Sequence, residues 1–199
     1  MVKTIINGEE KDFDAQDFQT FGDFLKKVIP EGQILKSLKI NSKDVPIAFI
    51  DELKSATVDE NITIEMELAN AVQFLKETLN DVLGYIEHVK SLLPQVSDNL
   101  LSNNEAGWKA IKDLSEGISA MENLKSSTQQ ITKLTEKELK LVAKPSEVMD
   151  ILNALLGALD MQDNLEVSDI IKNKVPIVLD YYIEYFSKTL ELIKSSQIN

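Results

Sequence analysis

The stretch ITIEMELANAVQFLKETL, residues 62–79, decides the fold because its hydrophobic period changes partway through. Up to Leu68, apolar residues occupy every second position, which is the period of a half-buried β-strand. From Val72 onward they recur every third or fourth residue, which is the period of an amphipathic α-helix. The change predicts two domains, residues 1–69 and 70–199, joined with almost no linker.

Short strands around one helix are predicted for residues 1–69. The dipeptide Asn7-Gly8 favours the two-residue turn of a β-hairpin, because both residues tolerate positive φ. Thr20 is placed to cap a helix that ends at Pro30. The remaining expected elements are a strand at 34–40, a short helical turn at 49–53 and a final strand at 62–68.

This order of hairpin, helix, strand, short helix and final strand resembles β-grasp (ubiquitin-like) domains. The resemblance implies a sheet face and a sheet edge that can dock another protein. The sulfur carriers and modifiers of this fold use a free C-terminal Gly-Gly, whereas here the final strand continues into a helix. The ferredoxin form of the fold needs cysteines, and the chain has none.

The first helix of residues 70–199 has the strongest periodic signal in the chain. Its apolar residues are spaced alternately by three and four, which predicts a buried seam ending where Pro94 breaks the helix. The seam residues are Val72, Leu75, Leu79, Val82, Ile86, Val89 and Leu93.

Three further amphipathic helices joined by short polar links complete an expected antiparallel bundle of about four helices, so the fold class is α+β. The bundle's length and acidity resemble those of small export chaperones such as the flagellin chaperone. No motif matches residue by residue, so this resemblance assigns no site. The three spans run from Asn103 or Asn104 toward Leu134, from Pro145 through Leu159, and from about Asn164 to Ser195 with a kink or restart at Pro176.

Charge and composition exclude several classes of partner. The chain has 33 acidic and 21 basic residues, a net charge of −12, and every basic residue is Lys. Such a chain repels phosphate backbones and anionic lipids, so we expect neither nucleic acid nor membrane as a partner. No secretory signal or membrane-spanning run is present, which favours a cytoplasmic protein.

No residue pattern reaches the strength of a catalytic, cofactor or metal motif. The single histidine, His88, lies two residues after Ile86 and should face away from the seam. The seven glycines are never closer than ten residues, which excludes phosphate-binding loops. Residues 160–164 superficially suggest a calcium loop, but Leu165 stands where Gly is required. We therefore expect no catalytic residue, no cofactor and no metal.

Aromatic residues supply the candidate protein-binding positions. Tyr181 and Tyr185 form a ridge on the last helix, and Trp108 lies near the start of the second. Aromatics with a polar tip suit an interface, but packing within the bundle would explain them equally well.

Three glycines lie inside predicted helices, where Gly costs about 1 kcal/mol relative to Ala. They are Gly84, Gly117 and Gly157. They suggest either close packing between helices or room for a partner helix.

These observations favour a non-catalytic interaction module, an adaptor or chaperone-like protein that binds a helical partner. The alternative is a structural protein that forms a homodimer through the seam of its first helix. An enzyme of unrecognised type is the third hypothesis, and we expect the protein not to be an enzyme.

Overall fold

The computed structural model describes residues 1–102 and 104–195. The chain divides into two compact units, Met1–Phe74 and Leu75–Asn199. Strand β5 ends at Asn70 and helix α3 begins at Ala71, so no linker residue separates them. The first turn of α3 is part of the first unit, where the Ala71 amide donates a 2.9 Å hydrogen bond to the Gly32 carbonyl oxygen.

The first unit is a five-stranded sheet with the β-grasp topology that the sequence predicts. The strand order is β2-β1-β5-β3-β4, in which β1 and β5 pair in parallel and all other neighbours are antiparallel. The strands are β1 (Val2–Ile6), β2 (Glu9–Phe13), β3 (Gln33–Ile40), β4 (Lys43–Asp44) and β5 (Thr63–Asn70). The helices are η1 (Ala15–Asp17), α1 (Phe21–Val28), η2 (Ile47–Phe49) and α2 (Ile50–Leu53).

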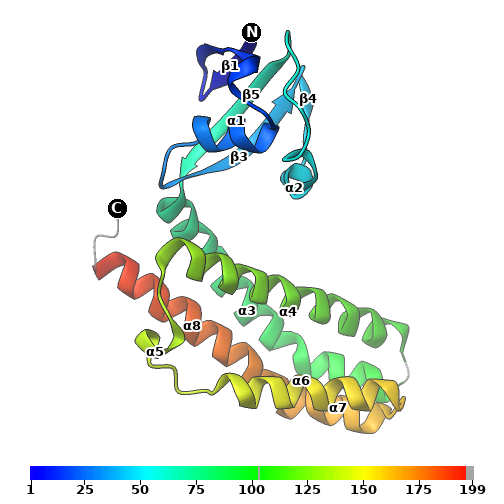
Figure 1. The fold of residues 1–199 in the computed structure, drawn as a ribbon. Coiled ribbons are helices and arrows are strands. Elements are labelled where there is room, and N and C mark those ends of the chain that lie inside the picture. Colours follow the sequence, from blue (N-terminus) through cyan, green and yellow to red (C-terminus); the bar gives the residue numbers. More distant parts are fainter. Residues whose placement is uncertain (103, 196–199) are drawn as a thin grey trace. The chain divides into compact units, whose positions relative to one another are not determined.

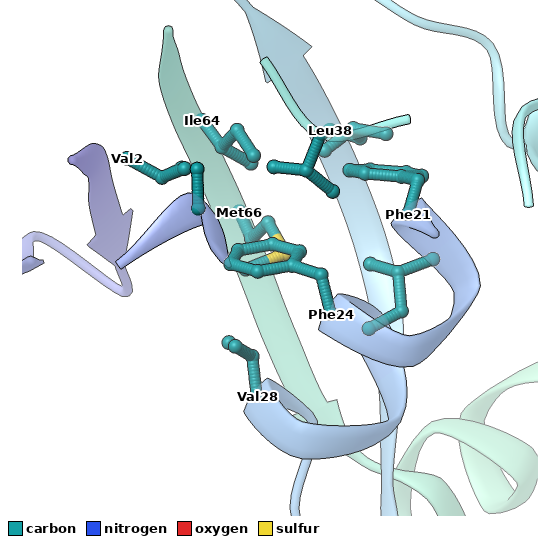
Figure 2. Close-up of a cluster of buried hydrophobic side chains, with 10 residues drawn as sticks. Val2, Phe21, Phe24, Val28, Leu38, Ile64 and Met66 are labelled. Carbon is teal, nitrogen blue, oxygen red and sulfur yellow. The ribbon is translucent and has the colours of Figure 1, made fainter. Parts of the chain in front are cut away.

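Local sequence signals explain the start of this unit. Asn7 and Gly8 both have positive φ, at 50° and 85°, as a two-residue hairpin turn requires. The Thr20 side chain accepts a 3.2 Å hydrogen bond from the Asp23 amide and caps α1. Helix α1 then packs its apolar face on the sheet, and Phe24 lies fully buried among residues of β1, β3 and β5 (Figure 2).

The second unit is a bundle whose helical rods alternate in direction along the chain (Figure 1). The prediction of about four rods is confirmed, although the described part of this unit holds six α-helices. One addition is the single turn α5, and the other arises because the fourth rod consists of two helices. The helices are α3 (Ala71–Leu101), α4 (Glu105–Thr132), α5 (Glu136–Leu139), α6 (Pro145–Asp160), α7 (Asn164–Asn173) and α8 (Val175–Ser195).

Two proline predictions have different outcomes. The restart near Pro176 is confirmed, because α7 ends at Asn173 and α8 begins at Val175. The predicted break at Pro94 is wrong, since α3 runs through it to Leu101. Buried contacts beyond Pro94 outweigh the lost backbone hydrogen bond: Ser97 shares a buried 2.7 Å hydrogen bond with Ser168 of α7.

The seam of α3 is confirmed as the buried face of the helix. Leu79 and Ile86 are fully buried, Val72 is 8% exposed, and the seam continues past the predicted end to Leu100. Asn104 caps α4 by accepting a 3.0 Å hydrogen bond from the Ala106 amide. The alternative cap, Asn103, lies outside the described residues. None of the helices in the described part of the chain combines the length and apolarity that a membrane span needs.

The helical glycines predict stability changes of opposite sign. A Cβ on Gly84 or Gly157 would meet nothing within 4 Å, so close packing does not explain these two residues. A Cβ on Gly107 would lie 2.9 Å from the backbone nitrogen of Leu100, so α4 needs glycine where it passes the end of α3. Gly117 has only an ordinary contact, 3.4 Å from the Tyr85 hydroxyl oxygen.

We expect Gly107→Ala to lower the free energy of unfolding by about 1 to 3 kcal/mol, because backbone must move to relieve the clash. The matched variant Gly84→Ala should raise it by about 1 kcal/mol, because alanine costs less backbone entropy in an open helix. Urea unfolding of both variants measures the difference. A stabilised Gly107→Ala protein would contradict the close approach of α3 and α4.

Candidate functional site

A cluster of charged and aromatic side chains lies inside the second unit, centred on Lys125. This residue continues the spacing of three and four that places Ile111, Leu114 and Met121 in the core of α4. A lysine therefore occupies a position where the helix pattern requires an inward side chain. The Lys125 cluster consists of Glu122 and Lys125 of α4, Glu136 of α5, and Tyr181, Tyr182 and Tyr185 of α8.

Two carboxylates and two aromatic rings surround the Lys125 ammonium. Its Nζ lies 2.9 Å from Glu136 Oε1 and 3.2 Å from Glu122 Oε1, and its side chain is only 12% exposed. The same nitrogen lies 5.3 Å from the centre of the Tyr181 ring and 5.9 Å from that of Tyr185. Charge-assisted hydrogen bonds and cation–π attraction both strengthen as water is excluded, so this lysine ties together α4, α5 and α8.

The tyrosine hydroxyls complete the network on the carboxylate side. Tyr181 donates a 2.8 Å hydrogen bond to Glu136 Oε1, and Tyr182 donates a 2.9 Å hydrogen bond to Glu122 Oε2. The Tyr185 hydroxyl is buried without a partner in hydrogen-bonding geometry among the described residues, although Gln129 lies nearby. Each carboxylate therefore contacts both the lysine and one tyrosine.

Burial and hydrogen bonds in this cluster move every shifted pKa further from neutral pH. Burial alone would lower the pKa of Lys125, but its hydrogen bonds to Tyr181 and Glu136 outweigh burial and raise that pKa. Burial raises the pKa of Tyr181 to about 12 and also raises the pKa values of Tyr182 and Tyr185. Burial opposes a lower pKa for Glu136, but hydrogen bonds from Lys125 and Tyr181 lower it. General acid–base catalysis needs a group that titrates near the working pH, so these five shifts favour a structural ion network.

A hollow of about 240 Å³ adjoins the cluster, between α4 and α6 and over α8. We call it the α4/α6 groove. Its lining is polar at the end formed by Glu122 and Lys125 and apolar along α6. The lining residues are Ile118, Ser119, Glu122 and Lys125 of α4, Pro145, Val148, Met149 and Leu152 of α6, and Tyr181 and Tyr182 of α8.

Large apolar side chains remain exposed along the α6 side of this groove. Met149 is 57% exposed and Leu156 is 58% exposed. They are seven residues apart, close to two helical turns, so they lie on the same edge of α6 beside half-buried Leu152. Helix α6 thus has a second apolar stripe that the bundle core does not use.

The structure brings two of the three predicted interface residues together and leaves the third apart. Tyr181 and Tyr185 are 1% and 0% exposed, so neither presents a surface to a partner in this conformation. Their burial supports the alternative explanation, packing within the bundle. Trp108 is half-buried and lies outside the Lys125 cluster. It is 14 residues from Glu122, close to four helical turns, so the two residues share one flank of α4.

His88 is exposed, as the sequence predicts, and therefore lies apart from the Lys125 cluster. It lines a separate, mainly apolar hollow of about 230 Å³ between α3 and α4, together with Tyr85 and Leu92. Among the described residues, no group of three or more His, Asp and Glu side chains is placed to hold a metal ion.

A family model described as Domain of unknown function (DUF8042) matches residues 77–185, which is more than half of the chain. The chain belongs to this family. No curated protein and no solved structure matches the sequence. The DUF8042 match begins within α3 and ends within α8, so it includes every residue of the Lys125 cluster and of the α4/α6 groove.

Sequence reasoning missed Lys125, Glu122 and Glu136 of the DUF8042 domain. Leu124 is the apolar residue that follows Met121 in α4, but it is only half-buried. The signal for Lys125 was the spacing of three and four along α4, which places residue 125 on the inward face of the helix. Glu136 carried no such signal, because its place depends on how the chain returns after α4.

The alkaline titration of Tyr181 tests the geometry of this DUF8042 domain. A raised folded-state pKa means that the folded protein holds the proton longer, so the resulting stability is complete below pH 10 and is lost as the pH rises toward 12. Absorbance at the tyrosinate band, compared between wild type and Tyr181→Phe, should yield a difference curve with a midpoint near 12. A midpoint near 10 would contradict the buried, hydrogen-bonded hydroxyl.

Proposed function

We propose that this protein is a non-catalytic interaction module that binds an amphipathic helix of another protein in the α4/α6 groove. The observation that carries the proposal is the second apolar stripe of α6, where Met149 stays exposed in the lining of the groove and Leu156 stays exposed two turns further along the helix. Helix-in-groove recognition uses apolar anchors at helical spacing, and this stripe offers matching contacts on the receiving side. We also propose a cytoplasmic location.

Charge favours a basic partner helix. Residues 70–199 contain 13 Lys and 19 acidic residues, a net charge of −6 (13 minus 19). Glu122 and Lys125 line the groove, and Lys125 also pairs with Glu136 outside that lining, so one ammonium faces two carboxylates. A Lys or Arg on the partner would balance the excess carboxylate, and electrostatic attraction would speed association.

The alternative of homodimer formation through the α3 seam has less support. Leu75, Leu79, Ile86 and Leu93 of that seam are at most 2% exposed within a single chain. A dimer through these residues would require the bundle to open. The exposed α6 stripe needs no such rearrangement.

A synthetic basic amphipathic peptide provides the test. The probe is an amphipathic peptide of about 18 residues, or five helical turns, with leucines on one face and lysines on the other. Its control has the same composition with the leucines spread around the helix. Calorimetry at physiological salt should show binding of the amphipathic peptide and much weaker binding of the control peptide.

Matched substitutions test whether the peptide binds in the α4/α6 groove. Met149→Glu and Leu156→Glu should each weaken binding at least about tenfold, because they remove exposed apolar anchors. Leu165→Glu makes the same kind of change at a residue of α7 that is 72% exposed and outside the groove, so it should leave binding unchanged. An added carboxylate attracts a basic peptide. Weaker binding by Met149→Glu or Leu156→Glu would therefore come from the lost apolar contacts and not from the added charge. Equal affinity of the Leu165→Glu and Met149→Glu proteins would refute binding in the groove.

A further inference from the structure

The segment 133–144, which joins α4 to α6 and contains α5, makes little use of apolar burial. All twelve of its residues are described, and only Leu139 is buried, at 3% exposure. A hollow of about 600 Å³ lies beside residues 133–137 and Gln129, so this part of the segment is not closely packed. Hydrophobic contacts therefore contribute little to its position.

Polar contacts to long side chains hold the segment in place instead. Glu136 binds Lys125 and Tyr181, as described for the Lys125 cluster. The Glu184 carboxylate of α8 accepts the Val142 amide at 3.0 and 3.1 Å.

A second contact from α8 holds the backbone of the segment at its centre. Lys188 donates a 2.7 Å hydrogen bond to the Lys140 carbonyl oxygen and also pairs with Glu184 at 2.6 Å. The Glu136, Glu184 and Lys188 side chains are between 21% and 33% exposed, so water competes for each of these bonds.

The backbone conformation of two residues also favours opening of the segment. Lys133 and Lys140, which end α4 and α5, have φ values of 60° and 50°. A residue with a Cβ adopts this left-handed region only at a cost in free energy. Opening of the segment would remove that cost. Ordering twelve residues also costs conformational entropy, and segments with few buried contacts open before the rest of a protein does.

Two of the three buried tyrosines of the cluster interact with this segment, Tyr181 through a hydrogen bond and Tyr185 electrostatically through Glu136. Tyr181 bonds directly to Glu136, and Tyr185 lies close to Lys125, Glu136 and Gln129. Tyr182 lines the α4/α6 groove, as Tyr181 also does, but its hydroxyl binds Glu122 of α4 and no residue of the segment. Displacing the segment would therefore uncover Tyr181 and Tyr185 and leave Tyr182 in place.

We propose that the 133–144 segment is a releasable cover that opens while the helices stay folded, and that its opening exposes Tyr181 and Tyr185. The exposed tyrosines extend the floor of the α4/α6 groove along α8. The opening is a property of the chain alone. Its use in partner binding, with the two tyrosines as added contacts, rests on the proposed function.

The test is carried out on the full chain without a partner. The variant Glu184→Ala/Lys188→Gln removes the contacts from α8 to residues 140–142. The control Glu191→Ala/Lys194→Gln makes the same changes at exposed residues of α8 that have no ion pair among the described residues. Amide hydrogen exchange measures opening, and acetylation of tyrosine hydroxyls by N-acetylimidazole, mapped by mass spectrometry, measures exposure.

In wild type, amides of 133–144 should exchange faster than the central amides of α4 and α8. In Glu184→Ala/Lys188→Gln they should exchange about tenfold faster still, and Tyr181 and Tyr185 should become acetylated at least about tenfold faster than in the control variant. Tyr182 and the amides of α4 and α8 should not change. Leu139→Ser, which removes the one buried anchor, should have the same effect and replaces the double variant if that protein does not fold.

Two results would overturn the proposal. One is exchange of the segment at the rate of the α8 core in wild type and in both variants, since the segment would then open only with global unfolding. The other is faster exchange without faster acetylation of Tyr181 and Tyr185, since the segment would then not cover them. Failure of the peptide to bind the α4/α6 groove would affect the proposed function only.

Discussion

Phe24→Ala is expected to lower the free energy of unfolding of the first unit by about 3 to 5 kcal/mol, the usual range for truncating a buried phenylalanine. Phe24 is 0% exposed and its ring packs edge-on against Phe13 and Phe18, with centroid distances of 5.8 and 5.2 Å. Truncation removes this buried area and leaves a cavity between α1 and the sheet (Figure 2). Neighbouring side chains are attached to paired strands and can close the cavity only in part.

Phe49→Ala is the matched control for this prediction. Phe49 belongs to the same unit but is 52% exposed, so its truncation should cost less than about 1 kcal/mol. Urea unfolding followed through amide exchange of residues 1–70 measures both variants in the unit concerned. Similar losses for the two variants would mean that Phe24 is not the centre of the core.

Lys125→Met is expected to cost about 2 to 3 kcal/mol in the second unit. The substitution keeps the length of the side chain but removes the positive charge between Glu122 and Glu136. Two carboxylates then remain partly buried without a counterion, which is costly because the lost attraction no longer offsets their desolvation. The exposure of Glu122, at 52% of its side chain, reduces the expected loss below that of a fully buried ion pair.

Lys112→Met provides the control for charge removal on the same helix. Lys112 pairs with Glu116 at 3.8 Å, and both side chains are at least 69% exposed, so the loss should be below about 0.5 kcal/mol. Adding Glu136→Gln to Lys125→Met should recover part of the stability, because one uncompensated carboxylate is then neutral. Without any recovery, the loss would have to come from packing and not from charge.

These predictions concern the different ways in which the two units are stabilised. The first unit depends on an apolar core. In the second unit, the ion network around Lys125 holds α4, α5 and α8 beside an apolar groove. Because the Lys125 cluster has two carboxylates and one lysine, we propose a basic partner helix for the groove. We propose that opening of the 133–144 segment controls how much of α8 is available.

The order of strands and helices followed from local periods in the sequence. Alternation at residues 62–68 indicated a strand, and spacing of three and four from Val72 indicated a helix. The turn at Asn7-Gly8 and the cap at Thr20 were also predictable, because each depends on side-chain and backbone contacts within a few residues. Such signals need no knowledge of distant parts of the chain.

The sequence by itself therefore determined the two-part α+β architecture, the β-grasp element order and the buried seam of α3. Only the tertiary structure decided that α3 continues through Pro94, that Tyr181 and Tyr185 face inward, and that Lys125 meets Glu136. Each of these depends on a partner from another helix, and its free energy comes from burial and charge pairing between segments far apart in the chain. A periodic pattern shows which face of a helix is apolar, but it does not show which residues of another helix will cover that face.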